Sequence, residues 1–95
     1  MATLYRTDGT TAELKPDNGV TWTLREWYKL LATDTVDILS TVDGRYLVID
    51  DNGKLREREL NIPATRLYIY GREDWIAGDA LVVDTKLELD GPEEV

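Results

Sequence analysis

The sequence predicts an α+β fold of two layers, with a mostly antiparallel sheet of about four to six strands and two helices. Glycine-containing turns at 8–9, 43–44 and 52–53 separate short apolar or alternating segments. Turns this short join antiparallel neighbours, because parallel strands need a longer crossover. Apolar residues with helical spacing predict a main helix at about 23–32, and a helix-start pattern predicts a short helix at about 62–68. We expect both helices to pack on one face of the sheet.

The first third of the chain predicts a hairpin followed by the main helix. Strand-like residues between Ala2 and Lys15 flank the Asp-Gly turn at 8–9, which favours a β-hairpin. Thr23 and Glu26 have the spacing of a capping box, in which each side chain accepts a hydrogen bond from the other residue's backbone amide. The apolar stripe of this helix consists of Leu24, Trp27, Leu30 and Leu31.

The middle of the chain predicts a second hairpin and a charged segment. Residues 36–41 alternate in polarity, and residues 45–50 form a nearly continuous apolar run that is typical of a central strand. Residues 54–59 are too charged to be buried on both sides. They are therefore expected to form an edge strand or an ordered loop.

The last third predicts the short helix and the closing strand. Asn61 and Pro63 indicate the start of the helix, because Asn caps well and Pro is tolerated in the first turn. A tight turn then leads into the final strand at 80–84. We expect residues 1–88 to form a single compact domain and residues 89–95 to form an acidic, disordered tail.

The absence of histidine and cysteine limits the chemistry that this chain can perform. Without them it has no Ser-His-Asp triad, no Cys-His pair and no zinc site of the usual kind. We therefore expect a protein that is not an enzyme, with no catalytic residue, no metal site and no cofactor.

The net charge of −8 argues against nonspecific binding to nucleic acid and against binding to anionic membranes. No apolar run is long enough to span a bilayer and no signal peptide is recognisable, so the cytoplasm is the expected location. The charge is uneven, because residues 45–72 carry six basic and four acidic residues whereas residues 73–95 carry one and eight. The basic segment is either ordinary solvated surface, which is favoured, or an anion-binding patch. Such a patch would consist of Arg45, Lys54, Arg56, Arg58, Arg66 and Arg72.

A small set of side chains has the chemistry to bind a nucleotide-like molecule. Such a ligand needs amide and hydroxyl donors, an aromatic ring to stack on and an arginine for phosphate. The candidate ligand-binding residues are Asn61, Thr65, Arg66, Tyr68, Arg56 and Arg58. For Asn61 and Thr65 a structural role, as helix cap and backbone hydrogen-bond partner, is the favoured alternative. The small size of the domain is also compatible with a site shared between the subunits of a homo-oligomer.

Three motifs occur in a fixed order along the chain: DNGKL at 51–55, LNIPAT at 60–65 and IAGDALV at 76–82. Together they resemble a family of small domains of unknown function that occur in bacteriophages, plasmids and bacterial genomes. The resemblance covers about residues 20–84 and departs at Glu59, where the family often has Pro. It implies an origin in a mobile element and no established chemistry. The positions that match the family's motifs are Asn61, Ala64, Thr65, Gly78 and Asp79.

Two functions of different classes are compatible with these observations. The first is a non-catalytic binding module that sequesters a nucleotide-like signal, as a phage counter-defence protein in the host cytoplasm. The alternative is an acidic protein-interaction module that blocks a host protein, for example a DNA-binding protein. In that case the carboxylates of Glu73, Asp74 and Asp79 would contribute to binding.

Overall fold

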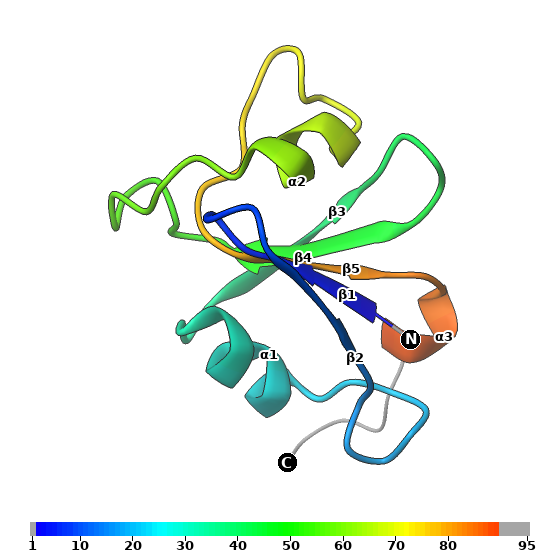
Figure 1. The fold of residues 1–95 in the computed structure, drawn as a ribbon. Coiled ribbons are helices and arrows are strands. Elements are labelled where there is room, and N and C mark those ends of the chain that lie inside the picture. The colour runs from blue at the N-terminus through cyan, green and yellow to red at the C-terminus, as the bar shows by residue number, and fades with distance from the viewer. Residues whose placement is uncertain (1, 90–95) are drawn as a thin grey trace.

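The computed structural model describes residues 2–89 and shows an open antiparallel sheet with helices packed against it (Figure 1). The strand order is β2-β1-β5-β4-β3, and every neighbouring pair is antiparallel. The predicted α+β class, the antiparallel sheet and both predicted helices are confirmed. The elements are β1 (Ala2–Tyr5), β2 (Thr11–Leu14), α1 (Leu24–Leu31), β3 (Val36–Ser40), β4 (Tyr46–Asp50), α2 (Ile62–Leu67), β5 (Ala80–Val83) and α3 (Lys86–Leu89).

The last strand in the chain, β5, lies at the centre of the sheet between β1 and β4. Its register aligns Leu81 with Leu4 of β1 and with Val48 of β4, so these three side chains form one row across the sheet. All four residues of β5 are buried. An apolar strand without alternation is expected where both faces of a sheet are covered, and this explains the ALVV run.

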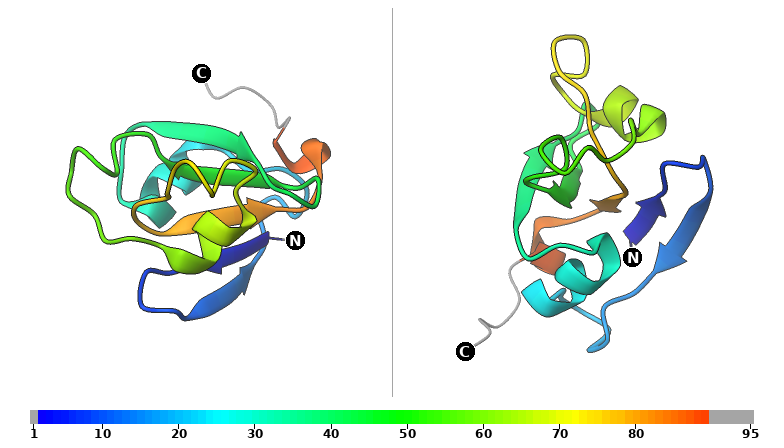
Figure 2. Two further views of the ribbon diagram at one scale, coloured as in Figure 1. Left: turned by 90° about the horizontal axis from the view of Figure 1, so that it is seen from above. Right: turned by 90° about the vertical axis from the view of Figure 1, so that its left-hand side faces the viewer.

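The two main helices lie on opposite faces of the sheet, and this layering differs from the predicted one (Figure 2). Helix α1 packs Trp27 and Leu31 in one core cluster with Leu81 of β5, whereas Ala64 of α2 packs with Val82 on the other side. Successive residues of a strand point to opposite faces. Because both faces of β5 are apolar, each face needs its own helix, and a single layer of helices would leave one face exposed.

The N-terminus of α1 has the predicted capping box. The Thr23 hydroxyl accepts the Glu26 amide at 3.2 Å, and the Glu26 carboxylate accepts the Thr23 amide at 3.0 Å. Trp27 and Leu31 are each 4% exposed, as expected for core positions. Leu24, which was assigned to the same stripe, is 44% exposed, so the buried part of the stripe begins at Trp27.

The charged segment at 54–59 is an ordered loop, which was one of the two predicted alternatives. Its backbone is held by hydrogen bonds from the Arg56 amide to the Asn52 carbonyl and from the Arg58 amide to the Gly53 carbonyl. The Gly78 amide donates to the Glu59 carbonyl at 2.8 Å. The loop is therefore fixed to the turn that enters β5.

The predicted acidic tail lies almost wholly outside the described residues, because residues 90–95 are not described. Leu89, the first residue assigned to the tail, is the last residue of α3 and packs against the core cluster on the α1 side of the sheet. Within residues 2–89, no helix has the length and apolar character needed to cross a membrane.

Gly71 provides a test of how closely the loop after α2 packs against that helix. A Cβ atom at Gly71 would lie 2.0 Å from the Thr65 carbonyl oxygen, a backbone atom that cannot move away cheaply. We expect Gly71→Ala to lower the free energy of unfolding by about 2–3 kcal/mol in urea denaturation. At Gly9, whose φ is +90°, a Cβ atom would meet nothing within 4 Å, so Gly9→Ala should cost only about 1 kcal/mol of backbone strain. Equal losses of stability in Gly71→Ala and Gly9→Ala would show that Gly71 does not lie so close to the Thr65 carbonyl.

Candidate ligand-binding site

Asn61 connects the start of α2 to the sheet and is fully buried, with 0% of its surface exposed. Its amide nitrogen donates to the carbonyl oxygens of Tyr5 and Gly78, both at 2.9 Å. Its amide oxygen accepts the backbone N–H of Ala64 at 3.1 Å, which is the helix-cap hydrogen bond. Both ends of the side-chain amide are bonded to the protein. These contacts agree with a structural role for Asn61 as helix cap and backbone hydrogen-bond partner.

Thr65 is placed one helical turn further on and has a similar role. Its hydroxyl donates to the Asn61 carbonyl at 2.7 Å and accepts the Ile76 amide at 2.9 Å. The second of these bonds ties the segment before β5 to α2. Both the donor and an acceptor lone pair of the hydroxyl are thus used within the protein.

Arg56 and Arg58 both lie beside the carboxylate of Asp50, the last residue of β4. The Arg58 Nε donates to Asp50 Oδ2 at 2.7 Å, and the Arg58 Nη2 donates to the Ala32 carbonyl at 2.7 Å. Arg56 lies 3.5 Å from the same carboxylate oxygen and also pairs with Asp34 at 2.9 Å. These two arginines bind internal acceptors, so they are not placed beside Arg66 and Tyr68.

The Asp50 carboxylate is buried, with its side chain 1% exposed. Burial by itself raises the pKa of Asp50, but hydrogen bonds from the Asn52 amide, the Thr33 hydroxyl and Arg58 outweigh it. The charge of Arg56 adds to these, and the pKa of Asp50 lies below its ordinary value as a result. The buried carboxylate is therefore held in its ionised form.

Arg66 and Tyr68 line a hollow of about 510 Å³ between α2 and the loop that follows it. Tyr70 and Arg72 line the same hollow and extend it along the loop. The rings of Tyr68 and Tyr70 meet edge to face, with centroids 5.8 Å apart, and Tyr70 is 60% exposed. We call this hollow, defined by Arg66, Tyr68, Tyr70 and Arg72, the tyrosine–arginine hollow.

The basic residues of the middle segment do not form one continuous free patch. Arg45 pairs with Asp43 and Asp84, and Lys54 pairs with Asp74. Arg56 and Arg58 both pair with Asp50, as described above. Within residues 2–89, no carboxylate lies within ion-pair distance of the two remaining basic residues, Arg66 and Arg72.

Two residues of the tyrosine–arginine hollow, Tyr70 and Arg72, were not among the six candidate ligand-binding residues, although Arg72 was included in the alternative anion-binding patch. A signal for Tyr70 was present in the sequence, because two tyrosines separated by one residue share a face of an extended segment. Tyr68 is extended and forms a β-bridge with Thr41, whereas Tyr70 lies in the turn that follows, where the Gly71 amide donates to the Tyr68 carbonyl at 2.9 Å. The two rings therefore meet across a turn and not along an extended strand. The placement of Arg72 beside Tyr70 has no comparable local signal, because it depends on the turn at 69–73.

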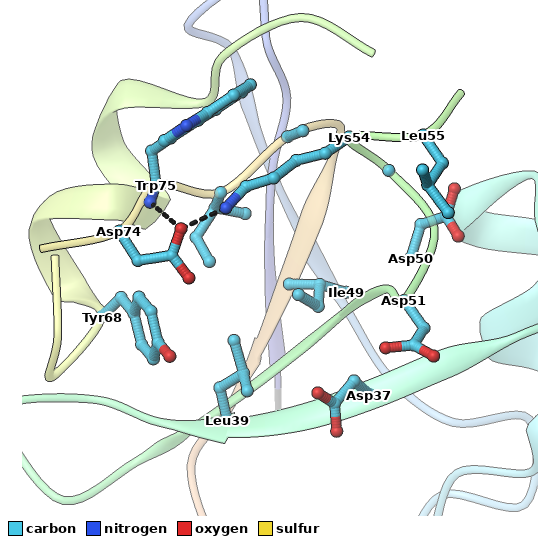
Figure 3. A pocket seen from close by; sticks show the side chains of 13 residues that line it. Asp37, Leu39, Ile49, Asp50, Asp51, Lys54, Leu55, Tyr68, Asp74 and Trp75 are labelled. Carbon is cyan, nitrogen blue, oxygen red and sulfur yellow. Dashed lines mark hydrogen bonds and ion pairs between the residues drawn. The ribbon is translucent and has the colours of Figure 1, made fainter. Parts of the chain in front are cut away.

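A second hollow lies on the other side of Tyr68, over strands β3 and β4 (Figure 3). Its lining includes the carboxylates of Asp37, Asp51 and Asp74, so its charge is opposite to that of the tyrosine–arginine hollow. The pKa of Tyr68 is raised, mainly by burial and then by the nearby negative charge of Asp74. Tyr68 therefore separates a basic hollow from an acidic one.

The three carboxylates proposed for partner binding, those of Glu73, Asp74 and Asp79, have different contacts in the structure. Asp74 pairs with Lys54, which lowers the pKa of Asp74, whereas Asp79 accepts the backbone amide of Thr7 at 3.0 Å. Glu73 lines the tyrosine–arginine hollow. In the part of the chain that the structure describes, no group of three or more His, Cys, Asp or Glu side chains is arranged to hold a metal ion.

Comparison with protein families, with curated proteins and with solved structures gives no match to this chain. The resemblance described above therefore rests on the three ordered sequence motifs alone.

Proposed function

We propose that this protein is a non-catalytic binding module whose tyrosine–arginine hollow holds a nucleotide-like ligand. One observation carries the proposal. Arg66 and Arg72, the two arginines of this hollow, have no carboxylate partner within residues 2–89, although the chain contains 19 acidic residues. Their guanidinium groups remain available for an anion.

The chemistry of the hollow fits a ligand that combines a phosphate with an aromatic base. Guanidinium groups bind phosphate through paired, charge-assisted hydrogen bonds. Tyr70 is 60% exposed and offers an aromatic ring for base stacking, which is worth about 1–3 kcal/mol per base. The volume of about 510 Å³ lies within the range of small-molecule sites.

The resemblance to phage and plasmid domains supports a biological setting for this proposal. A small module that binds a nucleotide-like signal and does not transform it would sequester that signal. We propose this role, as a counter-defence protein of a mobile element acting in the host cytoplasm. The three ordered motifs support the origin, and the tyrosine–arginine hollow supports the ligand class.

Calorimetric titration with a panel of cyclic and linear nucleotides tests the ligand class. We expect at least one nucleotide to bind, and we expect Arg66→Ala and Arg72→Ala each to weaken that binding roughly tenfold or more, because each removes a charge-assisted phosphate contact. Arg25→Ala is the matched control, since Arg25 is an exposed residue of α1 outside the hollow. The proposal would be contradicted if no nucleotide of the panel binds. It would also be contradicted if Arg25→Ala lowers the affinity as much as Arg66→Ala and Arg72→Ala do.

A further inference from the structure

The acidic hollow beside Tyr68 has an apolar floor and a negatively charged rim (Figure 3). Leu39 of β3 and Ile49 of β4, both partly buried, form the floor. Trp75 and Asp74 lie at one end, and Asp37 and Asp51 lie toward the other. The volume is about 440 Å³, enough for a small molecule. We call this hollow the amine groove.

One end of the amine groove already holds an ammonium group that belongs to the chain. The Lys54 Nζ lies 5.0 Å from the centre of the Trp75 ring and forms an ion pair with the Asp74 carboxylate. The same carboxylate accepts the Trp75 backbone amide at 2.8 Å, which fixes its orientation beside the ring. An aromatic face beside a carboxylate is a favourable environment for an alkylammonium ion.

The Lys54 contact is open to exchange with a ligand. The side chains of Lys54 and Asp74 are 45% and 49% exposed, and Trp75 is 42% exposed. Exposed ion pairs of this kind contribute little to stability, since water and salt compete with them. A soluble amine therefore needs only to displace a flexible lysine from a prearranged site.

The opposite end of the groove offers negative charge that the protein leaves unneutralised. The Asp37 carboxylate accepts the amide of its neighbour Ile38 at 2.9 Å, which is a local contact. Within residues 2–89, no lysine or arginine lies within ion-pair distance of Asp37 or Asp51. The groove thus presents negative charge at both ends of an apolar strip.

We propose that the amine groove binds an aliphatic diamine or polyamine. One ammonium group replaces that of Lys54 between Trp75 and Asp74. The methylene chain lies over Leu39 and Ile49, and the second ammonium group lies between Asp37 and Asp51. This ligand class matches both the order and the sign of the groups along the groove, because its charges are separated by an apolar chain.

Calorimetry with cadaverine, spermidine and the monoamine pentylamine at low ionic strength tests this inference, together with tryptophan fluorescence, to which Trp75 contributes the exposed ring. We expect cadaverine and spermidine to bind, and pentylamine to bind roughly tenfold more weakly because it makes one ionic contact fewer. Lys54→Met keeps the aliphatic side chain and removes the competing ammonium, so it should tighten diamine binding by about two- to fivefold. Asp51→Asn should weaken binding of cadaverine and leave binding of pentylamine unchanged.

A charge-matched control separates the groove from the general attraction of an acidic protein for cations. Asp74→Asn and Asp8→Asn each remove one negative charge, but Asp8 lies in the β1–β2 turn, where an asparagine oxygen can still accept its Thr10 hydrogen bonds. Only Asp74→Asn should weaken binding. Equal weakening by both variants would overturn the proposal, as would a Lys54→Met variant that binds no more tightly. Binding of oligolysine without binding of any free diamine would also overturn it, because that would indicate a protein-binding surface.

Discussion

Asn61→Ala is expected to lower the free energy of unfolding by about 3 kcal/mol, measured by urea denaturation followed by circular dichroism. The substitution removes two donated hydrogen bonds and one accepted bond at a position that is 0% exposed. The carbonyl oxygens of Tyr5 and Gly78 and the amide of Ala64 would then be buried without partners. Leaving buried polar groups unsatisfied costs about 1–3 kcal/mol each, reduced where water enters the space left by the side chain.

Two further variants separate the helix cap from the connection to the sheet. Asn61→Ser keeps a capping oxygen and loses the amide that reaches Tyr5 and Gly78, so it should recover only part of the loss. Asn61→Asp keeps the cap but places a carboxylate oxygen against two carbonyl oxygens, and it should be at least as unstable as Asn61→Ala. A stability of Asn61→Ser equal to that of the unsubstituted protein would show that the two bonds to carbonyl oxygens contribute nothing.

The role of Asn61 shows which parts of this fold are readable from the sequence. The cap on α2 was predictable because it depends on residues 61–64 alone, as the capping box of α1 depends on Thr23 and Glu26. The bonds to Tyr5 and Gly78 were not predictable, because Asn61 and Tyr5 are 56 positions apart. They follow from the pairing of β1 with β5, and no local pattern encodes that pairing.

The same distinction explains the candidate site. Residue type predicted a cation and an aromatic ring, and Arg66 and Tyr68 do line one hollow. Residue type could not show that Arg58 would be engaged by Asp50, since that pair depends on how the loop at 54–59 folds back toward the end of α1. The candidate site combined residues that are near in sequence, but the fold places Arg58 beside Asp50 and Arg66 with Tyr68 in the hollow.

Asp50→Asn should lower the free energy of unfolding at neutral pH by about 2–3 kcal/mol, because the buried carboxylate accepts hydrogen bonds from Arg58, from the Thr33 hydroxyl and from the Asn52 amide, which a neutral side-chain amide replaces only in part. The variant loses the charge that Arg58 binds at 2.7 Å and, in one orientation, turns an amide N–H toward the guanidinium. Asp51→Asn is the matched control, since Asp51 is the exposed neighbour and should change stability by less than about 0.5 kcal/mol.

The pH dependence of stability distinguishes this ionic role of Asp50 from simple packing. The pKa of Asp50 is lower in the folded protein than its ordinary value of 3.8, so the ionised carboxylate favours the folded state. That contribution is complete above about pH 4 to 5 and is lost as the pH falls through the ordinary pKa toward the lower folded value. The difference in stability between the unsubstituted protein and Asp50→Asn should therefore shrink with acidification across this window.

The pKa values of Asp43 and Asp74 are also lowered, so Asp50→Asn should retain part of the acid sensitivity. A stability difference that stays constant from pH 7 to the acid transition would mean that the loss comes from packing, because the carboxyl group of Asp50 titrates and the amide of Asn does not.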